Sequence, residues 1–220
     1  MRDFSDIEAR AFALKGKGLE SSLPTPATPA QLRKLGDDRY LAEMTACIFR
    51  SGFVWRVIET KWPGFEAAFW NFNVKRCAFM SDDDIEALSA DTRIVRHGKK
   101  ILSVRDNARF IAEIAAEHGS FGKFLADWPA DDIIGLTQVL KKQGSRLGGN
   151  TGFYFLRFVG KDTFMFSNDV VKTLVQEGVV DKAPTSQRDL RAAQDAMNTW
   201  ASESGRPLCQ VSRIMAASQE

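Results

Sequence analysis

The segment with the clearest chemical potential is a basic, glycine-rich stretch that reads Lys141-Lys142-Gln143-Gly144-Ser145-Arg146-Leu147-Gly148-Gly149-Asn150-Thr151. Glycine adopts backbone conformations that other residues avoid, and it leaves no side chain between the main chain and a ligand. The amides that such a turn exposes, together with the positive end of a following helix, bind phosphate oxygens. We therefore expect a site for the phosphates of a nucleic acid that consists of Lys142, Arg146, Gly148, Gly149 and Thr151.

Two helices must hold this turn in place. The residue pattern indicates one helix over about 131–142 and a second that begins near Thr151 and ends at Gly160. Together they predict a helix–hairpin–helix at about residues 132–160. Taken alone, a Gly-Gly turn is more often a simple helical corner that binds nothing.

A second feature is a run of aromatic residues within about twenty positions. Such a run forms either part of the core or a stacking pocket, and the core is the commoner outcome. The run consists of Phe53, Trp55, Trp62, Phe65, Phe69, Trp70 and Phe72.

The rest of the chain is also predicted to be helical. Ser81 and Ser186 are placed to cap helices, Asn168 and Asp169 are placed to begin one, and Gly119 is placed to end the longest. The only strand-like segment, residues 163–166, is too short to found a sheet. The pattern predicts an all-α fold with two helical lobes around a cleft.

Three segments are expected along the chain. Residues 1–30 form a short helix and a proline-rich linker, and residues 31–184 form the main helical region. Residues 185–220 form a C-terminal helical extension that packs on the same domain.

Composition narrows the class of protein. The chain has 220 residues, 44% of them hydrophobic, and a formal net charge of only +2, so bulk charge makes no case for nucleic acid. No apolar run is long enough to cross a bilayer, and the N-terminus does not have the pattern of a signal peptide. We expect a soluble, cytoplasmic protein that binds no membrane and shows no sign of an obligate protein partner.

The metal-ligating residues are few. Three widely spaced cysteines, Cys47, Cys77 and Cys209, fit a reducing compartment rather than a disulfide framework. With only two histidines, His97 and His118, no zinc spacing is present, and four cysteines for an iron–sulfur cluster do not exist. We expect no metal and no cofactor.

From about Tyr40 to Val171 the chain resembles the 3-methyladenine DNA glycosylase I family, within the helix–hairpin–helix glycosylase superfamily. The matching segments occur in the family's order and comprise residues 46–55, 91–101, 107–109, 121–125 and 140–144.

The resemblance implies roles for four further residues. Trp55 matches the family's base-stacking tryptophan, and Phe49 is expected to lie near it in the base pocket. In the superfamily an aspartate starts the helix after the hairpin, and Asp169 stands in that place as the carboxylate that stabilises the sugar cation or activates water. Helix capping alone is the other explanation for Asn168 or Asp169. Cys47 occupies the position of the glutamate that contacts the damaged base.

The chain departs from the family at its zinc site. The positions that correspond to the downstream histidine and cysteine ligands fall at Val170 and near Leu174, and no ligand stands at the N-terminus. The resemblance therefore implies a divergent member without zinc, in which the C-terminal extension covers the place of the missing metal.

The function implied is that of a monofunctional glycosylase, because no lysine nucleophile stands at hairpin positions 150–152. It would flip alkylated purines out of damaged double-stranded DNA in base excision repair and hydrolyse the N-glycosidic bond, with 3-methyladenine the expected base. One alternative is a helix–hairpin–helix DNA-binding protein with impaired catalysis, which Cys47 favours. Another is a helical interaction module that does not bind DNA.

Overall fold

The computed structural model describes residues 2–219, which form helices and connecting loops without a strand. The expected all-α fold is confirmed, and the strand-like segment 163–166 is a loop. Two compact units divide the chain: the first joins the N-terminal segment through Ala27 with residues 129–136 and 160 onward, and the second joins residues 28–128 with 137–159. Within residues 2–219, no helix has both the length and the apolar character of a membrane span.

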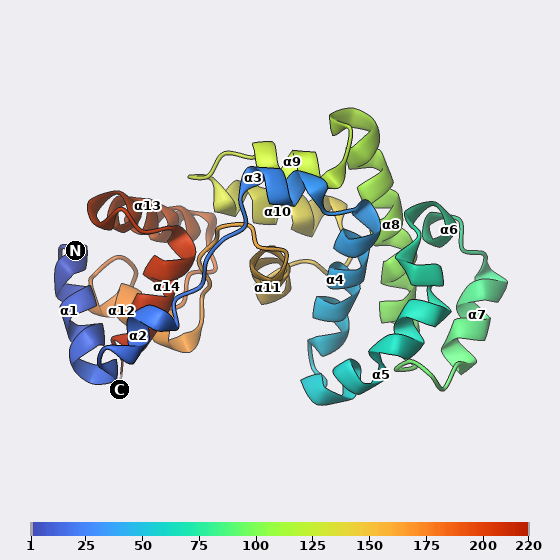
Figure 1. The fold of residues 1–220 in the computed structure, drawn as a ribbon, viewed down its shortest axis with the longest axis horizontal. Coiled ribbons are helices and arrows are strands. Elements are labelled where there is room, and N and C mark those ends of the chain that lie inside the picture. The colour runs from blue at the N-terminus through green and yellow to red at the C-terminus, as the bar shows by residue number, and fades with distance from the viewer. Residues whose placement is uncertain (1, 220) are drawn as a thin grey trace. The chain divides into compact units, whose positions relative to one another are not determined.

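The first unit gathers the two ends of the chain (Figure 1). Its helix α14 packs against α1, α12 and α13. The fully buried Trp200 lies beside Phe4, and its indole N–H donates to the carbonyl of Arg2 at 3.1 Å. The helices of this unit are α1 (Phe4–Lys15), α2 (Gly18–Ser21), α12 (Asn168–Gln176), α13 (Gln187–Ser204) and α14 (Leu208–Ala217).

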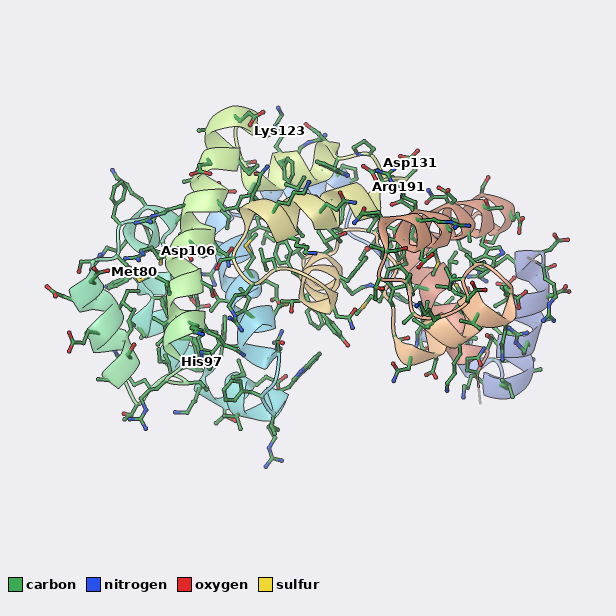
Figure 2. The ribbon with its side chains drawn as sticks, turned by 180° about the vertical axis from the view of Figure 1, so that it is seen from behind. Met80, His97, Asp106, Lys123, Asp131 and Arg191 are labelled. Atoms are coloured by element: carbon green, nitrogen blue, oxygen red, sulfur yellow. The ribbon has the colours of Figure 1, made fainter. Side chains whose placement is uncertain are left out.

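The second unit is built around the long helix α8 (Gly98–His118), which contacts α4, α6, α7 and α9. His97 lies at the start of α8 and accepts a hydrogen bond from the Lys100 amide, while Asp106 lies further along the helix (Figure 2). The other elements are α3 (Pro29–Lys34), α4 (Asp37–Arg50), α5 (Trp55–Ala68), η1 (Trp70–Phe72), α6 (Val74–Ala78), α7 (Asp82–Ala90), α9 (Phe121–Asp127) and α11 (Asn150–Phe158). Helix α10 (Ile133–Gln143) begins in the first unit and ends in the second.

Most predicted helix ends are confirmed, because caps are local signals. Ser81 forms a capping box with Asp84, Ser186 caps α13, and α8 ends at Gly119. The prediction that Asn168 or Asp169 caps α12 is wrong, since the Ser167 hydroxyl accepts from the amide of residue 170 instead.

The proline-rich linker is shorter than expected. Helix α3 begins at Pro29, and Thr28 caps it through a capping box with Gln31. Proline suits this position because the first helical residue has no partner for its N–H. The extended part of the linker therefore ends at Thr28 rather than at residue 30.

The contact between α3 and α9 gives a test of packing in the second unit. A Cβ on Gly122 of α9 would overlap the Leu32 carbonyl oxygen and would lie 3.1 Å from the Tyr40 ring. We expect Gly122→Ala to lower the free energy of unfolding by about 1–3 kcal/mol, because the buried site has no room for the methyl group. Gly98→Ala is the matched control, since nothing lies within 4 Å of its added Cβ. Equal denaturation midpoints for the two variants would contradict this packing.

Candidate functional site: a hairpin beside an aromatic pocket

The glycine-rich turn is held from outside by a buried asparagine. Asn107 of α8 donates to the Ser145 carbonyl at 3.0 Å and accepts from the Ser145 amide at 2.7 Å. Gly149, immediately before α11, has a φ of +58°, which favours glycine, and a Cβ on Gly152 would overlap the Leu147 carbonyl. The turn is therefore a fixed structure with specific glycine requirements.

The surface of this hairpin is basic and offers free amides. Lys142 and Arg146 are exposed, and no side chain caps the N-terminus of α11, whose preceding residue is Gly149. The first amides of a helix have no intrahelical partner and carry partial positive charge. The hairpin therefore has the groups that an anionic backbone needs.

A pocket of about 240 Å³ lies next to the hairpin, within the same unit. Helix α11 supplies one wall, and the end of α4 with the start of α5 supplies the other. The lining residues are Cys47, Arg50, Ser51, Gly52, Trp55, Asn150, Thr151, Tyr154 and Phe158. Thr151 and Asn150 thus belong both to the hairpin and to the pocket.

Three aromatic rings shape this pocket. The Trp55 ring meets the Tyr154 ring edge-on at 5.6 Å and the Phe158 ring at 6.0 Å, measured between ring centroids. Trp55 and Phe158 remain 41% and 45% exposed, which is unusual for large apolar side chains with neighbours to pack on. These open aromatic faces can accept a flat, apolar ring.

Polar groups of α4 line the same pocket. Cys47 is 4% exposed, and its thiol donates to Glu43 Oε1 at 3.5 Å. Burial, reinforced by the Glu43 carboxylate, holds the pKa of this thiol far above its usual range, so the thiol stays neutral. Arg50 donates from Nη1 to the same oxygen at 3.1 Å. Glu43 is therefore shared between two residues of the pocket wall.

A buried lysine supports the loop between α4 and α5. Lys100 is 4% exposed, and its ammonium donates to the carbonyls of Ser51 at 2.5 Å and Phe49 at 3.3 Å. Burial, with the nearby charge of Arg146, lowers the pKa of Lys100 to about 8. The carbonyl groups at the end of α4 thereby gain a donor, and Ser51 is held at the edge of the pocket.

The predicted site residues fall into four places, one of which is the hairpin itself, with Lys142, Arg146, Gly148 and Gly149. Trp55, Cys47 and Thr151 line the pocket, and Phe49 does not. Phe49 is fully buried and packs on the Phe65 ring at 4.8 Å, because the inward side of α4 faces the core. Asp169 belongs to the first unit, in the first turn of α12. The aromatic run likewise divides, with Trp55 at the pocket and the buried Phe65, Phe69 and Phe72 in the core.

Six of the pocket's lining residues were not predicted as site residues from the sequence: Arg50, Ser51, Gly52, Asn150, Tyr154 and Phe158. Tyr154 and Phe158 follow Asn150 at intervals of four residues, which places all three on one face of α11. Arg50 follows Cys47 by three residues on α4. That spacing was the available signal, but in a helix it describes core or solvated faces equally well.

The residues at the family's zinc positions do not fit a metal. Val170 and Leu174 lack ligating atoms and are buried in the first unit, where α12 packs against α14. Across residues 2–219, no group of three or more His, Cys, Asp or Glu side chains is arranged to hold a metal ion.

Known proteins resemble this chain over its central part. A sequence profile of the methyladenine glycosylase family matches residues 33–145, just over half of the chain. DNA-3-methyladenine glycosylase 1 of Escherichia coli strain K12 is 26% identical over 123 residues, which are 48% of this chain and 66% of that relative. The chain thus spans slightly less than two thirds of that relative's length.

Solved structures share the fold. A 3-methyladenine DNA glycosylase I from Staphylococcus aureus, studied for 3-methyladenine recognition, superposes with a TM-score of 0.52 at 24% identity, over 70% of this chain and 91% of that one. Another 3-methyladenine DNA glycosylase I gives 0.51 at 22% identity, over 66% and 86% of the two chains. At these identities the likeness concerns the fold alone.

The lowered pKa of Lys100 can be tested through the pH dependence of the protein's stability. Its pKa in the folded protein is about 8 against 10.5 when unperturbed, so the unfolded chain binds more protons between these values and stability from this group rises with pH there. Below pH 8 the cost of burying its charge is fully present. We expect the unfolding free energy of the wild type, minus that of Lys100→Met, to increase from pH 8 to 10.5 in chemical denaturation. A constant difference would show that Lys100 titrates normally.

Proposed function

This chain belongs to the methyladenine glycosylase family, and we propose that it is a monofunctional DNA glycosylase. It flips an alkylated purine, such as 3-methyladenine, out of double-stranded DNA and hydrolyses the N-glycosidic bond in base excision repair. The observation that carries this proposal is that a basic, glycine-rich hairpin adjoins an open aromatic pocket through Asn150 and Thr151. A flipped nucleotide requires both sites side by side.

The hairpin binds the DNA backbone in this proposal. Amides at Gly148, Gly149 and Thr151 contact phosphate oxygens, and Lys142 and Arg146 add positive charge. Such contacts position the protein without reading sequence. This suits an enzyme that must find a damaged base in any sequence.

The pocket binds the extruded base. Its volume of about 240 Å³ lies below the range of about 300–1,000 Å³ typical of sites for drug-sized ligands, which favours a single flat ring system. Stacking on Trp55 replaces the stacking that the base loses in the duplex.

Asp169 is the carboxylate that we assign to the chemical step. Because Ser167 caps α12, the Asp169 side chain is not needed for capping, and its partner is the exposed Lys172 at 3.1 Å. As the glycosidic bond breaks, positive charge develops on the sugar, and a carboxylate can stabilise it or orient the attacking water. Water adds at the sugar carbon, and the base departs with the bonding electrons.

Cys47 favours a second candidate function, that of a DNA-binding protein that has lost catalysis. A neutral thiol cannot replace the carboxylate that the family resemblance implies at this position. An assay on methylated duplex DNA, followed by alkali to cut abasic sites, distinguishes the two: alkali-labile sites form only if the base is released.

Asp169→Asn tests the assigned carboxylate. We expect base release to fall at least about 100-fold, because the charge that stabilises the transition state is lost, while retention of DNA changes little. Asp189→Asn is the matched control, since Asp189, like Asp169, is a half-buried aspartate in the first turn of a serine-capped helix of the first unit. Unchanged release by Asp169→Asn would remove this residue from the mechanism.

Lys142→Gln and Arg146→Gln test the hairpin. Each should weaken binding to all sequences alike and reduce the slope of log affinity against log salt concentration by about 1. Lys123→Gln on α9 serves as the control for an exposed lysine outside the hairpin. Equal slopes for all four proteins, measured by fluorescence anisotropy, would place the DNA elsewhere.

A further inference from the structure

We propose that Arg50 selects the base, and that the pocket prefers purines with an oxygen at position 6, the guanine derivatives, over purines with an amino group there. This inference rests on the proposed glycosylase function and names the substrate class of the same pocket. It reverses the preference for 3-methyladenine that the family resemblance implies.

The position of Arg50 is fixed by three contacts. Its guanidinium carbon lies 5.6 Å from the centroid of the Trp55 ring and 5.3 Å from that of Phe158. Glu43 holds the Nη1 end at 3.1 Å. A planar guanidinium held over aromatic rings and tied at one end is a pre-organised hydrogen-bond donor.

Arg50 meets the pocket with the outer part of its guanidinium. Its side chain is 20% exposed, while its Nε is buried and has no hydrogen-bond partner. Because a buried atom does not reach a ligand, the Nη groups are the donors that a bound base can meet. Arg50 is distinguished by its position in a pocket lined by Trp55, Tyr154 and Phe158.

The charged group in the lining of the pocket is a hydrogen-bond donor. Among residues 2–219, Arg50 is the charged side chain that lines it, and no carboxylate does. Glu43 stands behind the wall, where Oε1 accepts from both Cys47 and Arg50. Guanidinium groups donate hydrogen bonds and accept none. The neutral Cys47 thiol already donates its hydrogen bond to Glu43.

Guanine and adenine derivatives differ in the hydrogen-bonding groups that they would present to Arg50. Guanine derivatives present two neighbouring acceptors, O6 and N7, which a guanidinium can bind as a fork. Adenine derivatives present an acceptor at N7 and a donor at N6. The amino group would face the donors of Arg50 and leave both unpaired, which discriminates strongly between ligands.

The balance of charge permits an alkylated substrate. A purine methylated at N3 is cationic while it is attached to the sugar, and an isolated arginine would repel it. Glu43 balances the charge of Arg50 at 3.1 Å, so the pair is neutral as a whole. Methylation at N3 leaves O6 and N7 unblocked.

The test compares 3-methylguanine with 3-methyladenine, which carry the methyl group on the same atom and differ in the group at position 6. DNA treated with dimethyl sulfate contains both, and the released bases are quantified by mass spectrometry. We expect wild-type protein to release 3-methylguanine about tenfold faster, within the range of one bidentate pair. Arg50→Met should bring the ratio of the two rates close to one.

Two further variants keep the test decisive. Arg50→Lys keeps the charge but not the fork, so it should reduce the ratio, and it serves if Arg50→Met fails to fold. Arg33→Met, an exposed arginine of α3, should leave the ratio unchanged. Preferred release of 3-methyladenine, equal rates, or a ratio insensitive to Arg50 would overturn this inference while the proposed function stands.

Absence of any base release would instead contradict the proposed function. Binding of the free bases then tests the pocket separately, by calorimetry with 3-methylguanine and 3-methyladenine. Tighter binding of 3-methylguanine that is lost in Arg50→Met supports the selection. Equal affinities, or no binding of either base, overturn it.

Discussion

The packing of α11 against the end of α4 is the contact on which the site depends. One face of α11 carries Asn150, Tyr154 and Phe158, and that face meets Arg50 and Trp55 across the pocket. Because α11 is also the second helix of the hairpin, this packing fixes the distance between the glycine-rich turn and the aromatic faces. In the proposed function, a nucleotide in the pocket would contact the hairpin with its phosphate and the aromatic faces with its base, within one compact unit.

Buried polar contacts maintain this arrangement at its two weak points. The hairpin turn lacks regular structure, and Asn107 supplies both a donor and an acceptor to Ser145. The loop after α4 leaves carbonyl groups without helical partners, and Lys100 donates to them. Both side chains come from α8, so the longest helix of this unit supports both edges of the site. A buried polar side chain is tolerated in a protein interior when it forms hydrogen bonds, as these two do with backbone groups of the loops.

The sequence predicted those features that local signals determine. Glycines, capping residues and helical periodicity identified the hairpin, most helix ends and the all-α fold, and the resemblance placed Trp55 at a pocket. The pocket wall could not be predicted in this way. Arg50, Tyr154 and Phe158 meet only through tertiary packing, and nothing local distinguishes a pocket-facing aromatic residue from a core residue such as Phe49.

The cap of α12 and the role of Glu43 show the same limit. Ser167, Asn168 and Asp169 are all good capping residues, and only the position of the helix start decides among them. Glu43 lies one turn before Cys47, where its carboxylate reaches both Cys47 and Arg50. In sequence, that residue is indistinguishable from one on a solvated helical face.

The central claim is that one nucleotide occupies the hairpin and the pocket together. The most direct measurement is NMR chemical-shift mapping of the wild-type protein with a duplex whose methylated purine is attached to a 2′-fluoro sugar, so that the glycosidic bond resists hydrolysis. The amides of Gly149 and Thr151 and the indole N–H of Trp55 should shift together and saturate at the same DNA concentration. Shifts at the hairpin with an unperturbed Trp55 would contradict the claim.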